Sequence, residues 1–198
     1  MKTNISHKDI EHFYITLYFS KSHSDCKKKA IWRAYRDFSR TLRNLSQNHQ
    51  EVKNKWEKLL CNLIEEVCQN DFNEKQFDEW HKENTEKLKK YSLDYTLTIG
   101  QAQKWINMTL KYCFLLGEEK IPGITKNVDY FHIPIDNIIQ DRIFEEFKIN
   151  RIDESWSRID CYSKYMNIKK SSEKRLVKTK LLLKWNLKCL MKIFNLIL

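Results

Sequence analysis

The spacing of apolar residues predicts helices along most of the chain. Over 26–46 apolar side chains recur every three or four residues, and the same spacing returns over 51–69 and 74–91. Further helices are expected from Thr98 to about Leu116, from about Asp136 onward, and over 153–167. The apolar and aromatic segment 11–20 fits either a helix or a short strand. The apolar pattern therefore predicts a mainly helical protein.

The residues at the predicted helix ends support this pattern. Thr98-x-x-Gln101 is a capping-box sequence, whose hydroxyl and amide satisfy backbone groups at a helix start. This helix should stop at Gly117, and Asp136 stands where the next helix needs its N-cap. The loop between them is long for a compact domain, and such loops are more often functional than idle.

Turn-forming residues are scarce and concentrated in one region. The 198 residues include only 3 Gly and 2 Pro, and all of them lie between positions 100 and 134. Sandwiches and barrels need many tight turns, so we expect an all-α protein. The length suits one helical domain over 1–198, a compact bundle.

The charge balance favours an anionic partner. The net charge is +10, from 36 basic and 26 acidic residues, as in many nucleic-acid-binding proteins. One face of the predicted helix 26–46 is basic, and either faces solvent or contacts phosphates. Residues 173–198 form an apolar segment with a lysine row, expected to close the core rather than lie on a membrane surface. The basic positions of the two segments are Lys29, Arg33, Arg36, Arg40, Arg43, Lys180, Lys184, Lys188 and Lys192.

Cysteine and apolar patterns exclude several classes. The six cysteines form no CxxC pair, so we expect reduced thiols in a cytoplasmic protein, without a zinc site or iron–sulfur cluster. No run of 18 apolar residues occurs, and the N-terminus lacks the apolar stretch of a signal peptide. We therefore expect neither a membrane span nor export.

Lys104 and Asp136 are the candidate catalytic residues. An amine is a nucleophile only when neutral, and the positive end of a helix dipole disfavours an ammonium near it. An aspartate at a helix N-terminus stays ionised, which suits it to stabilising a developing cation or accepting a proton. Taken separately, Lys104 and Lys111 could form a solvated stripe, and Asp136 could be only a cap.

Together, the segments LTIGQAQKWINMTLKYCFLLG and HIPIDNIIQDRI resemble the core of the helix–hairpin–helix DNA glycosylases. In that superfamily a hairpin ends in glycine and opens the helix that carries the catalytic lysine. A Pro-x-Asp then places the catalytic aspartate at the next helix. Gly100 and Lys104 match the first half, and 134–136 matches the second. The long separation is most similar to the archaeal 8-oxoguanine DNA glycosylase branch. At 97–100 the chain reads Leu-Thr-Ile-Gly, where the family has Leu-Pro-Gly-x-Gly.

The resemblance implies a helix–hairpin–helix-like element, with a catalytic core at about 93–148. It further implies a monomer that flips a damaged or modified base out of double-stranded DNA and excises it without a metal or organic cofactor. Lys104 would form a Schiff base, and Asp136 would stabilise the oxocarbenium-like sugar. Candidates for stacking on the base are Trp105, Tyr130, Phe131 and Trp156; candidates for DNA contact are Gly100, Gln101, Lys29, Arg33, Arg36, Arg40 and Lys111. The biological role would be repair or defence against foreign DNA.

Two other interpretations stay open. Arg43 and His49 have the Arg-x-x-x-x-x-His form of HEPN-type ribonucleases, which are helical and usually dimeric. The charge and the amphipathic helices would also suit a nucleic-acid-binding or interaction protein without catalytic activity.

Overall fold

The protein is entirely helical over the residues that the structure describes. This computed structural model describes residues 6–19, 25–42, 50–90 and 95–176. These ranges contain seven α-helices, three short 3-10 turns and no strand, which confirms the all-α prediction. The elements are α1 (His7–Phe19), α2 (Cys26–Phe38), η1 (Ser39–Thr41), α3 (Gln50–Gln69), α4 (Glu74–Lys90), α5 (Ile99–Leu116), η2 (Val128–Tyr130), α6 (Asn137–Phe147), η3 (Trp156–Arg158) and α7 (Tyr162–Leu176).

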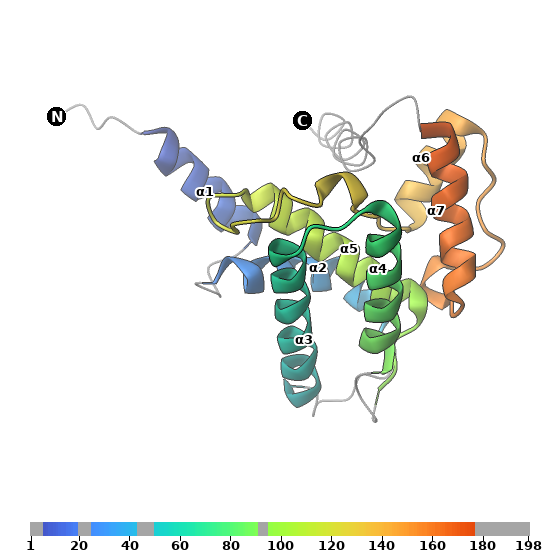
Figure 1. Ribbon diagram of the computed structural model, residues 1–198, viewed down its shortest axis with the longest axis horizontal. Coiled ribbons are helices and arrows are strands. Elements are labelled where there is room, and N and C mark those ends of the chain that lie inside the picture. Colours follow the sequence, from blue (N-terminus) through green and yellow to red (C-terminus); the bar gives the residue numbers. More distant parts are fainter. Residues whose placement is uncertain (1–5, 20–24, 43–49, 91–94, 177–198) are drawn as a thin grey trace.

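Helix α5 is the centre of the molecule. Every residue from Ile99 to Cys113 is buried, polar ones included. Figure 1 shows α5 running through the middle of the fold, with α3 and α4 side by side and α1 projecting outward. Helices α2, α4 and α7 and the turn η3 all pack against α5. A side chain on α5 is therefore held by neighbours on all sides, which fixes the position of any group it carries.

The predicted helix ends at the candidate site are confirmed. The Thr98 hydroxyl accepts from the N–H of Gln101 at 3.1 Å, and the Gln101 amide oxygen accepts from the N–H of Thr98 at 3.0 Å. The other end of α5 closes at Gly117, whose φ of 86° suits glycine. Asp136 caps α6 by accepting from the N–H of Ile139 at 2.8 Å.

The turn η3 closes the fold over the start of α5. The Gly100 N–H donates to the Ile159 carbonyl at 2.8 Å, and the Thr98 hydroxyl donates to the Ser157 carbonyl at 2.8 Å. A Cβ at Gly100 would lie 1.8 Å from the Trp156 carbonyl oxygen, so only glycine allows this approach. The residue is thus a packing requirement of α5 against η3.

Three of the predicted segments have different bounds. Residues 11–19 of the segment 11–20 belong to helix α1, and the helix predicted over 26–46 breaks after Phe38 into the turn η1. The single helix predicted over 153–167 is wrong: the chain forms η3, leaves helical geometry at Ile159 with a ψ of 119°, and begins α7 at Tyr162. The Ile159 carbonyl is needed by Gly100 and so cannot join a continuous helix.

Part of the predicted surface lies outside the described residues. Arg43, His49 and the lysine row at 180–192 fall there, and their predicted roles stay predictions. Within the described ranges, no helix combines the length and the apolar character that a membrane crossing requires.

Candidate active site

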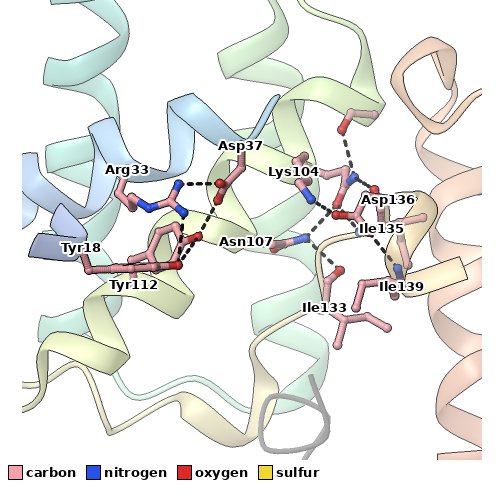
Figure 2. Close-up of polar contacts among 12 residues, drawn as sticks. Tyr18, Arg33, Asp37, Lys104, Asn107, Tyr112, Ile133, Ile135, Asp136 and Ile139 are labelled. Carbon is pink, nitrogen blue, oxygen red and sulfur yellow. Dashed lines mark hydrogen bonds and ion pairs between the residues drawn. The ribbon is translucent and has the colours of Figure 1, made fainter. Parts of the chain in front are cut away.

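Lys104 and Asp136 meet, although they lie 32 positions apart along the chain. The Lys104 Nζ donates to Oδ2 of Asp136, while Oδ1 of the same carboxylate caps α6. Figure 2 shows the lysine pointing from α5 toward the first turn of α6. The lysine side chain is 4% exposed and the aspartate 16%, so the pair lies just beneath the surface. Such a pair can exchange a proton internally and still reach a ligand from outside.

The neighbouring residue, Gln103, holds the two halves of the site together. Its amide nitrogen donates to the Gly100 carbonyl at 2.9 Å and to the Ile135 carbonyl at 3.1 Å. Its amide oxygen accepts from the N–H of Ile135 at 3.3 Å. Residues 133–135 are fully buried, so their backbone groups need such partners. Gln103 therefore fixes the chain just before Asp136 against the start of α5.

A buried polar network supports the same loop one helical turn further along α5. The Asn107 amide donates to the Ile133 carbonyl at 3.3 Å and to the Tyr165 hydroxyl at 3.0 Å. The Tyr165 hydroxyl also contacts His132 Nδ1 at 3.0 Å, and His132 Nε2 lies 2.7 Å from Asp78. The loop before Asp136 is thereby tied to α4, α5 and α7 at once.

The two buried histidines of this network are neutral. Burial lowers the pKa of His132 to about 4, although the hydrogen bond to Asp78 opposes the change. Burial, and then the nearby His132, lower the pKa of His81 well below its ordinary value. In His81, Nε2 donates to the Asn107 amide oxygen at 2.8 Å and Nδ1 accepts from the Tyr162 hydroxyl at 2.7 Å. These histidines hold the fold, and neither is among the residues that line the candidate cavity.

A cavity of about 290 Å³ opens beside the Lys104–Asp136 pair. Its walls come from α1, α2, η1, α5 and the start of α6, and its charged lining is mainly basic. The lining residues are Tyr18, Arg33, Arg36, Asp37, Arg40, Lys104, Met108, Lys111, Tyr112, Pro134, Asp136, Ile138 and Ile139. The structure thus brings Lys104, Asp136 and four of the predicted DNA contacts to one hollow.

The wall opposite Lys104 is a hydrogen-bonded group on α1, α2 and α5, visible on the left of Figure 2. Arg33 donates to Asp37 at 2.6 Å and to the Tyr18 hydroxyl at 3.3 Å. The Tyr112 hydroxyl donates to the other oxygen of Asp37 at 2.5 Å. Burial and the Asp37 charge raise the pKa of Tyr112, so its hydroxyl remains protonated. Tyr18, Asp37 and Tyr112 were not predicted from the sequence, where the one available signal was the four-residue spacing of Arg33 and Asp37.

Lys111 lies inside this cavity. It stands two helical turns after Lys104 on the same face of α5, and is only 1% exposed. Burial, and then the charge of Lys104, lower the pKa of Lys111 to about 7. The solvated stripe considered for Lys104 and Lys111 is therefore wrong, because both side chains are buried.

The four aromatic residues predicted to stack on the base lie at different distances from Lys104. Trp156 lies beside the site, with the Lys104 Nζ 5.5 Å from its ring centroid. Trp105 points into the core, where its N–H donates to the Ile31 carbonyl at 3.1 Å. Phe131 is also core, and Tyr130 is half-buried against the core in η2. Only Trp156 is brought to the lysine and aspartate.

The residues predicted to contact DNA also differ in whether they are exposed at the cavity. Arg36 and Arg40 are exposed at the cavity rim, whereas Lys29 is half-buried on α2 away from the lining. Gly100 is buried, with its N–H bonded to Ile159. The Gln101 side chain is turned inward, where its amide donates to Thr41. In this conformation neither Gly100 nor Gln101 offers a donor to a phosphate.

No group of three His, Cys, Asp or Glu side chains in the described ranges is arranged to hold a metal ion. Comparisons of the chain with protein-family models, with curated proteins and with solved structures find no match. Function must therefore be inferred from the site itself.

Proposed function

We propose that the protein is a DNA glycosylase with AP lyase activity, which excises a damaged or modified base from double-stranded DNA. The observation that carries this proposal is the contact between Lys104 and Asp136 at the wall of a basic cavity. A nucleophilic amine, a carboxylate beside it and a cationic approach are the groups that attack on a nucleotide sugar requires.

The pair supplies a route for the proton. In the ion pair Lys104 holds its proton, and Asp136 Oδ2 is the atom placed to accept it. The neutral amine then attacks C1′ of the sugar, and the bond from C1′ to the base nitrogen breaks. The base leaves with the electron pair of that bond and takes the proton that Asp136 accepted, which restores the Asp136 carboxylate. The Asp136 carboxylate, held by the N–H of Ile139, stabilises the positive charge that develops on the sugar.

The lyase step follows from the covalent intermediate. Opening of the sugar ring between C1′ and O4′ leaves a protonated imine that joins C1′ to Lys104. Loss of a proton from C2′ then expels the 3′ phosphate, and water releases the sugar fragment from the enzyme. These steps require a lysine amine and a group that accepts protons, and water is the only other reactant.

The surroundings of the pair suit a nucleotide turned out of the duplex. A base within the stack is out of reach for such a lysine, so the target must be flipped. The Trp156 ring centroid lies 5.5 Å from the Lys104 Nζ, and because the ring is buried and does not line the cavity, it would have to become exposed to stack on a base. Arg36 and Arg40 are exposed at the rim and carry charge toward the phosphates of the strand.

The test is reductive trapping with borohydride. Duplexes that contain an abasic site, oxidised guanine or a modified cytosine are incubated with the protein, and covalent protein–DNA adducts are separated by electrophoresis. We expect an adduct with the wild type and none with Lys104→Ala. The matched control is Lys82→Ala, which removes an exposed lysine from α4 and should leave the adduct unchanged.

Two results would contradict the proposal. An adduct that persists in Lys104→Ala would show that another residue is the nucleophile. The absence of both adduct and base release on all three duplexes would show that the protein lacks the proposed glycosylase and lyase activity. Activity confined to oxidised guanine would favour repair, whereas release of modified cytosine would favour defence against foreign DNA.

A further inference from the structure

Helix α1, which projects outward in Figure 1, carries a patch of exposed apolar side chains, Phe13, Tyr14 and Leu17, which we call the α1 patch. Their exposed fractions are 60%, 62% and 71%, and they are half of the six large apolar side chains exposed within the described ranges. All three share one face of the helix, because Leu17 follows the other two by four and three residues. The adjoining face packs on α5 through Tyr18, whose ring centroid lies 5.8 Å from that of Tyr112. Apolar side chains gathered on a surface in this way indicate an interaction site.

The α1 patch lies beside the candidate cavity. Tyr18 lines the cavity, and Tyr14 stands about one helical turn before it on α1. Arg36 and Arg40 are exposed at the cavity rim. The nucleotides next to one that enters the cavity thus come close to both a basic rim and an aromatic patch. Surfaces that bind single-stranded nucleic acid combine these two elements, since cationic groups follow the phosphates and aromatic rings stack on the bases.

The donors that the family resemblance assigns to DNA at the start of α5 are used within the fold. The Gly100 N–H donates to the Ile159 carbonyl at 2.8 Å, and the Gln101 amide donates to the Thr41 carbonyl at 3.1 Å. Flipping a base out of a paired duplex costs free energy, and this cost is least for a base that is already unpaired. A protein that meets DNA through stacking side chains is therefore better suited to an unpaired target.

Charge favours DNA over a second copy of the chain as the occupant of the α1 patch. Each copy has a net charge of +10, so two copies repel one another, whereas a DNA strand is a polyanion. Two of the three side chains are also aromatic, and every base offers a face on which an aromatic ring can stack.

We propose that the α1 patch stacks on unpaired bases next to the target nucleotide. The preferred substrate is then a damaged or modified base in an unpaired stretch of double-stranded DNA, such as a bubble, rather than in a fully paired duplex. This inference rests on the proposed function, since it takes the reaction at Lys104 as given. Phe13 and Tyr14 supply the aromatic rings, and Arg36 and Arg40 contact the phosphates of the same strand.

The first test measures binding without any target base. The probe is a fluorescent oligothymidylate of about 12 nucleotides, a length within the usual range of single-strand sites, and fluorescence anisotropy reports its affinity. Tyr14→Ala should weaken binding about tenfold, as the loss of one stacked base implies, and Phe13→Ala should act in the same direction. Tyr14→Trp should retain the affinity, whereas Tyr14→Leu should not, because only an aromatic ring stacks on a base. The matched control is Phe144→Ala, which removes a 46% exposed aromatic ring from α6 outside the cavity lining and should leave binding unchanged.

The second test measures the reaction itself. An abasic site is placed either in a bubble or in a fully paired duplex of the same flanking sequence, and borohydride trapping is followed at limiting protein concentration. We expect the wild type to be trapped about tenfold faster on the bubble, as one stacked base implies. Tyr14→Ala should remove most of this preference, and Phe144→Ala should keep it. A thermal unfolding curve establishes that each variant is folded.

Three outcomes would overturn the stacking role of the α1 patch. The first is equal oligothymidylate affinity in Tyr14→Ala and Phe144→Ala, and the second is equal trapping of the wild type on bubble and paired DNA. The third is a dimer in size-exclusion chromatography that Leu17→Ala dissociates without any change in oligothymidylate binding, because the patch would then join two copies. Failure of the glycosylase proposal looks different: trapping is then absent or independent of Lys104, while oligothymidylate binding still depends on Tyr14.

Discussion

Replacing Gly100 by alanine tests whether this glycine serves packing or DNA. Helix propensity and the smaller entropy of the unfolded chain both favour alanine within a helix, together by about 1 kcal/mol. Against this, the added Cβ would meet the Trp156 carbonyl oxygen at 1.8 Å. The turn η3 must move away, which also weakens the hydrogen bond from Gly100 to Ile159.

The steric clash with Trp156 determines that Gly100→Ala destabilises the protein. Overpacking of this kind costs about 3 kcal/mol, and the weakened hydrogen bond about 1 kcal/mol more. After the gain in propensity, Gly100→Ala should destabilise the protein by about 3 kcal/mol. For a chain of this size each kcal/mol lowers Tm by about 2–4 °C, so we expect a decrease of about 6–12 °C.

Urea unfolding followed by tryptophan fluorescence, together with thermal unfolding by circular dichroism, measures the effect. Gly117→Ala is the matched control: no atom lies within 4 Å of its Cβ position, and its φ of 86° alone should cost about 1–2 kcal/mol. If Gly100→Ala were as stable as the wild type and lost only DNA affinity, the packing argument would be refuted. The glycine would then serve phosphate contact, as the family resemblance implies.

Three further predictions concern polar groups in the core. Because His81 and His132 are neutral in the fold, the unfolded chain binds more protons than the folded protein between pH 6.5 and about 4. The free energy of unfolding therefore decreases as the pH is lowered through this window. The lowered pKa of His132 alone should reduce the free energy of unfolding by about 3 kcal/mol at pH 4 relative to neutral pH. A urea midpoint that is equal at pH 7 and pH 4.5 would contradict this expectation. Asp136→Ala should cost about 3 kcal/mol because it leaves a buried ammonium, whereas Lys104→Met should cost under about 1 kcal/mol; urea unfolding that reverses this order would exclude the reasoning. Asn127→Ala removes three hydrogen bonds to backbone groups near the α3–α4 connection and should cost about 2–4 kcal/mol in the same assay, and a loss below 1 kcal/mol would count against it.

Features set by a few neighbouring residues could be predicted from the sequence. The capping box of Thr98 and Gln101 and the cap at Asp136 both depend on local residue types, and the structure contains both. The apolar faces of α3 and α4 follow from spacing alone. The meeting of Lys104 with Asp136 could be predicted only from the family resemblance, because two residues 32 positions apart can be brought together or kept apart by many folds.

Features set by distant segments could not be predicted. Nothing near Gly100 in the chain indicates that the turn at Trp156 will press against it. Trp105 and Trp156 are alike in sequence terms, yet only the second lies beside Lys104. The burial of Lys111 likewise depends on how α1 and α2 cover α5, and its spacing from Lys104 was equally consistent with a solvated stripe.

Gln103 makes the site tolerant of change in the loop before it. Its contacts to that loop reach only the N–H and carbonyl of Ile135, groups that nearly every amino acid carries. The exposed side chains between Gly117 and Ile133 can therefore diverge without altering how the end of the loop is held, whereas the buried Asn127 and His132 are fixed by their own hydrogen bonds. Since Gln103 and Lys104 are adjacent, the grip on the loop and the amine also move as one rigid unit. Substrate range could drift through loop variation while the distance between amine and carboxylate stays constant.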